Sequence, residues 1–228
     1  MRIECFTVGM FQVNTYLVTD EATGASAIVD TGETDELVRR LEALDPAPDV
    51  RMILLTHAHL DHAGGLVFLQ ERFDVPTVLP TLERPLFETL PMQGRMFGLP
   101  QLDRECGRID RWIDDGDTVE LGETTLRFLS TPGHTPGQGC YFDDHDILVG
   151  DTLFAGSIGR TDFPLSDPKV MVESLRRLMD LPGPLRVHSG HGPVTTLAAE
   201  LKDNPFLGYI RREKGIAGGP SIRWAPGT

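Results

Sequence analysis

The sequence is poor in cysteine and in positive charge. It has three cysteines in 228 residues, Cys5, Cys106 and Cys140, which are far apart and form no CxxC pair. An odd number of widely spaced cysteines is not the framework of a disulfide-bonded domain, so we expect reduced thiols. The 21 Lys and Arg residues are outnumbered by 34 Asp and Glu residues, which gives a formal net charge of −13. This balance disfavours nucleic-acid binding, which needs a basic face.

Long hydrophobic runs are also missing. No apolar stretch approaches the length needed to cross a membrane, and the start, Met1-Arg2-Ile3-Glu4, does not lead into the hydrophobic segment of a signal peptide. We therefore expect a cytoplasmic protein without a membrane partner. The sequence does contain 40% hydrophobic residues. In a chain of this length, that content supports a proper core and one large domain or two small ones.

Strand and helix patterns alternate along the chain. Strands are predicted at residues 2–8, 14–19, 25–29, 52–55 and 75–79, and helices at residues 33–44 and about 66–73. The second half adds strands at residues 117–121, 125–129, 139–142, 147–149 and 185–188, and helices at residues 168–179 and 195–202. Asp167 followed by Pro168 is a typical helix start. The alternation predicts an α/β or α+β fold.

Two segments are expected to be irregular. In residues 81–112, Pro85, Pro91 and Pro100 interrupt any long helix. We expect a short helix and a loop there, which either cover a pocket or pack as ordinary surface. Residues 215–228 are rich in Gly and Pro and are predicted to form a loose tail. The predicted organisation is one domain over residues 1–214, followed by this tail.

The densest cluster of polar side chains is Thr56-His57-Ala58-His59-Leu60-Asp61-His62, directly after the apolar run at residues 52–55. In an extended chain, residues two apart point the same way, so His57 and His59 can reach one cation. The helical spacing that follows forces a turn, which presents Asp61 and His62 in another direction. The stretch therefore favours two neighbouring metal ions over a histidine-rich surface loop.

Other candidate ligands follow predicted strands at glycine-flanked turns. They are His134, Asp151 and His191. Each alone would be an ordinary turn residue, but their recurrence at strand ends indicates one shared site, and zinc accepts His nitrogen and Asp oxygen readily. His145, in a polar hairpin turn, and His188, three residues before His191, are not expected to be ligands.

These motifs resemble a known superfamily. Residues 57–62 resemble the HxHxDH signature of the metallo-β-lactamase fold hydrolases, and Asp30-Thr31-Gly32 resembles their early DTG. Residues 131–137, 150–152 and 190–192 resemble their later ligand motifs in the expected order. Within the superfamily the sequence is most similar to the glyoxalase II-like thioesterases, and residues 159–164 resemble the short bacterial members. The resemblance covers residues 1 to about 195 and implies an αββα four-layer sandwich.

The resemblance implies a binuclear centre. The first metal would be bound by His57, His59 and His134, and the second by Asp61, His62 and His191. Asp151 would bridge the two, and Asp61 is also expected to be required for catalysis. Two Zn²⁺ ions per chain are the expected cofactors, with iron or manganese as alternatives. A bridging hydroxide would be the nucleophile, because two cations about 3.5–4 Å apart lower the pKa of a shared water towards neutrality.

Two further residues each have two alternative roles. Asp30 either orients a metal-bound histidine through its free ring nitrogen, which the resemblance favours, or caps the following turn. Arg160 either pairs with an anionic group of the substrate, as the resemblance implies for this region, or forms a salt bridge with Asp162 or Glu173.

The function that the resemblance implies is hydrolysis of a small-molecule thioester, S-2-hydroxyacylglutathione, to a 2-hydroxy acid and glutathione. Full-length relatives bind glutathione with a helical C-terminal domain, and residues 193–228 are too short to form one, so glutathione recognition stays open. A persulfide dioxygenase with one iron bound by His57, His134 and Asp151 is an alternative, and a lactonase is another. A non-catalytic binding module is disfavoured because every ligand position is filled. The sequence does not set the oligomeric state.

Overall fold

The first half of the chain forms a six-stranded mixed sheet in the computed structural model, which describes residues 1–99, 102, 106–181 and 183–212. Its strands, in spatial order, are β1 (Arg2–Val8), β2 (Val13–Thr19), β3 (Ala25–Val29), β4 (Asp49–Leu54), β5 (Thr77–Pro80) and β6 (Arg111–Ile113). β1, β2 and β3 pair antiparallel, whereas β3, β4, β5 and β6 pair parallel. The segments that follow β3 and β4 therefore start at the same edge of this sheet.

The second half forms another six-stranded mixed sheet, with the order β14-β13-β10-β9-β8-β7. Its strands are β7 (Thr118–Leu121), β8 (Thr124–Ser130), β9 (Gly139–Phe142), β10 (Asp146–Gly150), β13 (Arg186–Ser189) and β14 (Thr195–Thr196). β9 is antiparallel to β8 and β10, and β13 is parallel to β10. Consequently β8, β10 and β13 run in the same direction and end at one edge. A small ribbon, β11 (Leu153–Phe154) and β12 (Ser157–Ile158), follows β10.

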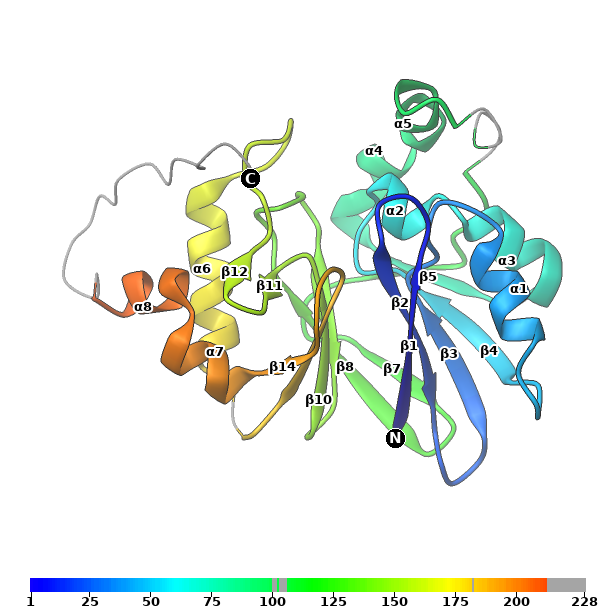
Figure 1. Cartoon of the computed structure of the whole chain (residues 1–228), viewed down its shortest axis with the longest axis horizontal. Coiled ribbons are helices and arrows are strands. Elements are labelled where there is room, and N and C mark those ends of the chain that lie inside the picture. Colours follow the sequence, from blue (N-terminus) through cyan, green and yellow to red (C-terminus); the bar gives the residue numbers. More distant parts are fainter. Residues whose placement is uncertain (100–101, 103–105, 182, 213–228) are drawn as a thin grey trace.

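The two sheets lie face to face, and helices cover both outer faces (Figure 1). The first sheet is flanked by α1 (Glu36–Glu42), α2 (Leu60–Ala63), α3 (Leu66–Phe73), η1 (Thr81–Glu83), α4 (Arg84–Phe87) and α5 (Leu90–Met96). The second is flanked by α6 (Pro168–Met179), α7 (Leu197–Asp203) and α8 (Pro205–Arg212). Between the sheets, buried side chains such as Val29 and Leu54 share one cluster with Leu126 and Tyr141. This is the predicted αββα sandwich.

Most predicted elements are present, with shifted ends. The helix predicted at residues 33–44 is shorter, and the segment predicted as a helix at residues 195–202 begins with β14 before α7 starts. The start of α6 is as predicted, because the carboxylate of Asp167 accepts hydrogen bonds from the N–H groups of Lys169 and Val170 at 2.8 and 3.2 Å. The sequence does not predict α8 or the strands β6, β11 and β12. These three strands have only two or three residues each, which is too few to show an alternation of apolar and polar side chains.

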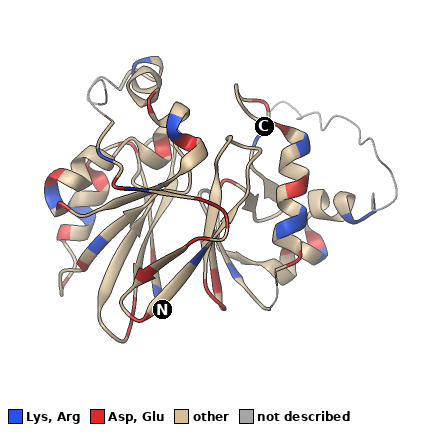
Figure 2. Ribbon diagram, turned by 180° about the vertical axis from the view of Figure 1, so that it is seen from behind, with Lys and Arg blue, Asp and Glu red and all other residues tan. Residues whose placement is uncertain are grey.

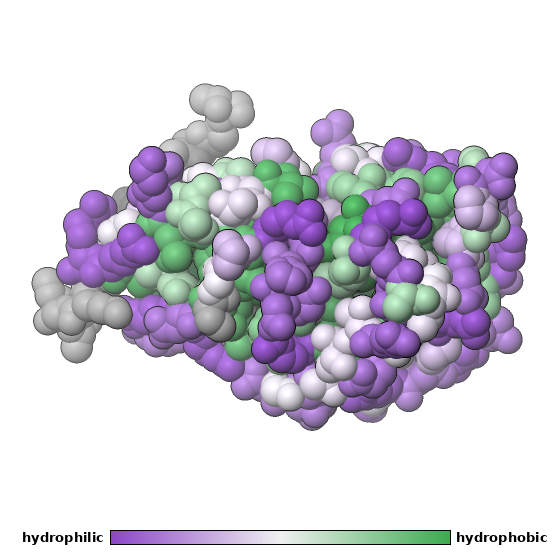
Figure 3. All heavy atoms as spheres, turned by 90° about the horizontal axis from the view of Figure 1, so that it is seen from below, coloured by the Kyte–Doolittle hydropathy of each residue, from purple (hydrophilic) through white to green (hydrophobic). Residues whose placement is uncertain are grey.

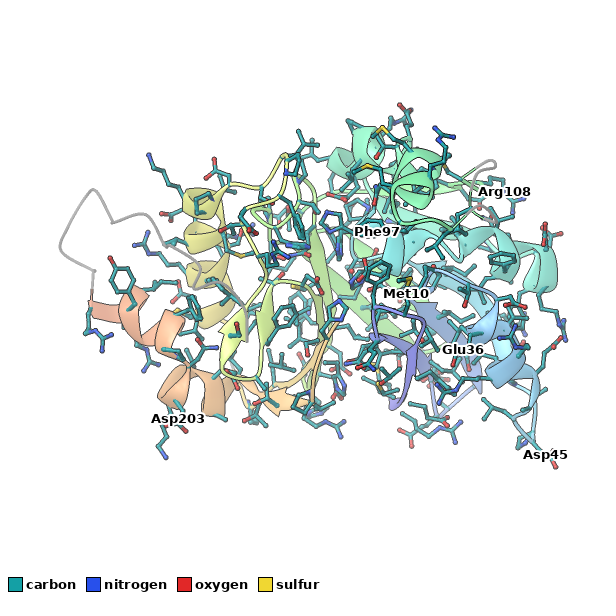
Figure 4. All side chains as sticks on the ribbon, turned by 45° about the horizontal axis from the view of Figure 1, so that its top comes forward. Met10, Glu36, Asp45, Phe97, Arg108 and Asp203 are labelled. Carbon is teal, nitrogen blue, oxygen red and sulfur yellow. The ribbon has the colours of Figure 1, made fainter. Side chains whose placement is uncertain are left out.

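The proline-rich segment before β6 contains short helices. Pro85 and Pro91 stand in the first turns of α4 and α5, where the missing N–H of a proline costs nothing. The end of α5 contacts the turn between β1 and β2, because the ring of Phe97, the residue after the helix, meets the ring of Phe11 edge-on at 5.1 Å. Figure 4 labels Phe97 and also Met10, which stands in that turn. Pro100 and the predicted tail at residues 215–228 lie outside the described residues.

The distribution of charged and hydrophilic side chains on the surface agrees with the composition of the sequence. On the side seen in Figure 2, basic residues are interspersed with acidic ones along the helices and form no continuous patch among the residues drawn in colour. Figure 3 views the molecule from below, and hydrophilic side chains predominate there. Within the described ranges, no helix combines the length and hydrophobicity needed to cross a bilayer. All three cysteines are free, as expected.

Candidate metal centre

The candidate ligands meet because of strand direction. Asp30 follows β3 and the histidine-rich segment follows β4, at one edge of the first sheet. His134, Asp151 and His191 follow β8, β10 and β13, at one edge of the second sheet. The two edges therefore bring loops from opposite halves of the chain into one place.

Hydrogen bonds across the two edges fix the loops to each other. The N–H of Gly139 donates to the carbonyl of Thr56 at 3.1 Å, and the N–H of Asn14 donates to the carbonyl of Gly190 at 2.7 Å. The side-chain amide of Asn14 also donates to the carbonyls of Ser189 and Gly192, at 3.1 and 2.8 Å. The loop that carries His191 is thus held by β2 of the other sheet.

The seven predicted ligands form three overlapping groups, in each of which the potential ligand atoms lie within 4.8 Å of one another. The groups are His57-His59-His134, His57-His62-Asp151 and Asp61-His62-His191. The first and third match the two predicted ligand sets, and the second contains the predicted bridge. The seven side chains, which come from both halves of the chain, therefore form one centre with the donor set of a binuclear metal site.

Individual distances are short enough for shared cations. His59 Nδ1 and His134 Nε2 lie 2.9 Å apart. On the other side, His191 Nε2 lies 3.1 Å from Asp61 Oδ2. Asp151 lies between the two sides, since its Oδ1 is 3.3 Å from His62 Nε2 and its Oδ2 is 3.5 Å from His134 Nε2.

Unpaired polar atoms test whether these residues fit a metal. His57 Nε2, His62 Nε2 and Asp151 Oδ1 are buried and make no hydrogen bond, although His62 Nε2 and Asp151 Oδ1 lie 3.3 Å apart. Buried polar atoms are normally paired, so three such atoms in one place need an explanation. They are also the three members of one of the groups above. A divalent cation would satisfy all three at once, so the residues fit a metal.

Two histidines are oriented through their other ring nitrogen. His62 Nδ1 lies 2.8 Å from Asp30 Oδ2, and Asp30 also accepts hydrogen bonds from the N–H and hydroxyl of Thr56 at 2.8 Å each. His134 Nδ1 lies 2.8 Å from the carbonyl oxygen of Arg160. Such contacts fix the tautomer that leaves Nε2 free to face the centre. The structure therefore gives Asp30 a contact that can orient His62.

Glycines permit the close approach of the loops. A Cβ atom on Gly190 would lie 2.3 Å from Asp151 Oδ1 and 2.6 Å from His62 Cε1. At Gly150, which has a φ of +50°, a Cβ atom would lie 2.5 Å from the hydroxyl of Thr56. Any side chain at Gly190 would therefore displace two of the candidate ligands.

Burial sets the charge of the histidines. Burial lowers the pKa of His57 well below its usual value, aided by the neighbouring histidines, and lowers the pKa of His59 to about 3. Both rings are therefore neutral, which is the form that binds metals. Around His62, burial disfavours the charge, but Asp151, Asp61 and Asp30 outweigh burial and raise the pKa. A cation bound among these carboxylates would take the place of that proton.

The centre is open on one side. His57 and His62 are fully buried, whereas the side chains of Asp61 and His191 are 18% and 30% exposed. Phe163 lines the centre with an apolar ring, which meets the rings of His59 and His134 edge-on at 5.4 and 5.8 Å. A small molecule can thus approach past Asp61 and His191 beside an aromatic surface.

The remaining predicted residues are placed as follows. Arg160 forms a bidentate salt bridge with Asp162, with both N–O distances at 2.9 Å, and stacks over the ring of Phe163. One of its two expected alternatives, the salt bridge, is therefore present. His145 is exposed in its hairpin turn, and His188 Nε2 contacts Asp146 at 2.7 Å. Neither belongs to the three ligand groups, as expected.

The sequence analysis missed Glu83 and Gln93, two residues that hold the ligand loops. Glu83 is fully buried, and its carboxylate accepts hydrogen bonds from the N–H groups of Ala58 and Gly137. The side-chain oxygen of Gln93 accepts a hydrogen bond from the N–H of Leu60 at 3.0 Å. Neither residue stands in a motif or shows a spacing that a single sequence would reveal.

Known proteins are similar to this chain in sequence. The profile of the Metallo-beta-lactamase superfamily matches residues 8–191. Hydroxyacylglutathione hydrolase GloC of Haemophilus influenzae is 39% identical over 214 residues, which cover 91% of this chain and 98% of that protein.

Solved structures agree with the sequence match. A protein called TTHA1623, crystallised in a di-iron-bound form, is 37% identical with a TM-score of 0.79, over 90% of this chain and all of that one. The B3 metallo-beta-lactamase BLEG-1 is 31% identical with a TM-score of 0.81, over 90% of this chain and 99% of that one. Because the profile extends from β1 to the last candidate ligand and these relatives align over nearly the whole chain, the protein belongs to the metallo-beta-lactamase superfamily.

Proposed function

We propose that the protein is a binuclear metallo-hydrolase that cleaves S-2-hydroxyacylglutathione thioesters. His57, His59 and His134 would hold the first metal, and Asp61, His62 and His191 the second, with Asp151 shared. The observation that carries the proposal is the position of Asp61, whose carboxylate faces the centre 3.1 Å from His191 Nε2. A mononuclear iron site made of His57, His134 and Asp151 has no use for that carboxylate.

The chemistry divides between metals and chain. Two bound divalent cations supply a water of lowered pKa and polarise the substrate carbonyl. The chain orients its ligands: Asp30 faces His62 Nδ1, and the carbonyl of Arg160 faces His134 Nδ1. Phe163 contributes an apolar ring beside His59 and His134, and the partly exposed side chains of Asp61 and His191 leave the centre accessible to substrate.

A thioester suits this set of residues. Hydrolysis forms a C–O bond to water oxygen and breaks the C–S bond, and the sulfur leaves as a thiolate that water later protonates. A thiol with an ordinary pKa of about 8.5 is a good leaving group without a general acid. The centre therefore needs a nucleophile and charge stabilisation, which metals supply, and no separate proton donor.

The glutathione part of the proposal is supported by similarity. GloC, whose name states hydroxyacylglutathione hydrolysis, is matched over 98% of its length. A relative of nearly the same length carries that name, which supports the proposal that glutathione can be recognised without an additional helical domain. The di-iron form of TTHA1623 supports two metals and keeps iron beside zinc as a candidate metal.

The function is tested with two substrates on the unmutated protein. Zinc-loaded protein is expected to hydrolyse S-lactoylglutathione under nitrogen, measured as loss of thioester absorbance, and to consume no oxygen with glutathione persulfide. Hydrolysis of a simple lactone without hydrolysis of the thioester would favour a lactonase. Oxygen uptake by iron-loaded protein without thioester hydrolysis would replace the proposal with the dioxygenase alternative.

Arg160 is predicted to contact an anionic group of the substrate. Asp162 competes for the same guanidinium, so Arg160→Ala is expected to raise KM for an anionic thioester about 3- to 10-fold, whereas Asp162→Ala should lower it. A neutral ester should show little change with either variant. Equal effects of Arg160→Ala on both substrates would mean that the salt bridge is purely structural.

A further inference from the structure

A buried glutamate outside the ligand set connects the two halves of the centre. Glu83 lies in η1, directly after β5, and is fully buried. Its Oε2 accepts a hydrogen bond from the N–H of Ala58 at 2.7 Å, and its Oε1 accepts one from the N–H of Gly137 at 2.6 Å. Each carboxylate oxygen therefore holds a different loop.

Both loops carry ligands of the first metal. Ala58 stands between His57 and His59, at the end of the first sheet. Gly137 closes the turn that begins with His134, at the end of the second sheet. Gly137 also packs against Glu83 itself, since a Cβ atom there would lie 2.6 Å from the backbone nitrogen of Glu83. The carboxylate of Glu83 thus connects the two loops whose spacing determines the 2.9 Å separation of His59 Nδ1 and His134 Nε2.

Gln93 also supports the loop that carries His57 and His59, but not the loop that carries His134. Its side-chain amide donates to the carbonyl of Ala58 at 3.3 Å, and its oxygen accepts from the N–H of Leu60 at 3.0 Å. These bonds hold the first loop alone, whereas Glu83 holds both. Of these two side chains, Glu83 is therefore the one that can set the distance between the loops.

Burying a glutamate at this position costs free energy of folding. A buried carboxylate loses its hydration and needs strong partners. The ion pairs found in the described part of the chain include none to Glu83, and its carboxylate is held by the N–H groups of Ala58 and Gly137. A fold that needed only packing here would be served by an apolar side chain.

We propose that Glu83 is a positioning residue for the first metal. The carboxylate of Glu83 fixes the spacing of His59 and His134, and this spacing sets the affinity of the His57-His59-His134 group for a divalent cation. The proposal rests on the binuclear site of the proposed function but not on its thioester substrate. Metal binding measured without substrate separates the two.

The test is a zinc titration of Glu83→Gln. The carboxamide keeps one acceptor oxygen and turns an N–H₂ towards a backbone N–H, so only one of the two loops stays bonded. Competition with a chelator should show one of the two Zn²⁺ sites weakened about 10- to 100-fold, as for other residues that support a ligand, with the other site retained. The visible spectrum of the Co²⁺-loaded variant should change accordingly.

Glu200→Gln is the matched control. Glu200 is also a buried glutamate, and it accepts hydrogen bonds from the N–H of Gly156 at 2.8 Å and the hydroxyl of Thr195 at 2.7 Å, away from the ligand loops. Glu200→Gln should lower the Tm and leave both Zn²⁺ affinities unchanged.

Three outcomes would overturn the proposal: wild-type affinity at both sites of Glu83→Gln, equal weakening of both sites, or the same affinity loss in Glu200→Gln. If Glu83→Gln does not fold, Glu83→Asp is titrated in its place. It keeps the charge but is one methylene too short to reach both loops, so the same three outcomes decide.

Discussion

Asp151→Ala is expected to reduce thioester hydrolysis by at least about three orders of magnitude, the scale of losing charge stabilisation in an active site. The Asp151 carboxylate approaches both sides of the centre, at 3.3 Å from His62 Nε2, 3.5 Å from His134 Nε2 and 3.7 Å from His191 Nε2. Removing it leaves only the more distant Asp61 Oδ2, at 3.7 Å, facing His62 Nε2, and takes away the carboxylate that the two ligand sets share. Metal content should therefore fall together with activity.

Elemental analysis and kinetics on the same preparations check this expectation. The unmutated protein should contain up to two metals per chain, and Asp151→Ala fewer. His145→Ala is the control, because His145 lies exposed in the hairpin turn between β9 and β10 and belongs to no ligand group. It should change neither metal content nor rate. Equal losses in the two variants would mean that the ligand assignment is wrong.

Asp61→Ala is expected to have the second-largest effect, and it separates the two enzyme classes. The Asp61 carboxylate lies 3.1 Å from His191 Nε2 and 3.7 Å from His62 Nε2, on the open side of the centre. In a binuclear hydrolase its loss leaves the second metal with His62, His191 and the shared carboxylate. Hydrolysis should then fall by at least about 100-fold, and the second metal should bind weakly.

The dioxygenase alternative makes a different prediction for the same variant. An iron held by His57, His134 and Asp151 does not use Asp61, so Asp61→Ala should keep its iron. Iron content, thioester hydrolysis and oxygen uptake are therefore measured together on the variant and the unmutated protein. Retained iron in Asp61→Ala, with oxygen uptake on glutathione persulfide in the unmutated protein, would exclude the thioesterase. Asp61→Asn retains the shape without the charge and shows whether the charge is the cause.

Residue type and local order were enough to predict much of the centre. His57 and His59 alternate after a buried strand, and the turn before α3 presents Asp61 and His62 differently, so local geometry alone points to two cations. His134, Asp151 and His191 each follow a strand end, which places them at a sheet edge. Likewise, the carboxylate of Asp167 determines the start of α6 by accepting hydrogen bonds from the N–H groups two and three residues later, and Pro168 stands in the first turn. These features are local, and a single sequence contains local features.

Tertiary structure decided how these parts are held. The partners of Glu83 are N–H groups 25 and 54 positions away in sequence, and the side chain of Asn14 holds the His191 loop across 175 positions. Every residue except proline offers a backbone N–H, so such a bond leaves no pattern in the partner's sequence. Arg160 illustrates the same limit, because its possible partners (a substrate anion, Asp162 or Glu173) are all negatively charged, and the sequence does not distinguish between them. The sequence by itself determined which atoms can bind a metal, whereas only the packing of the two sheet edges decided what keeps those atoms in place.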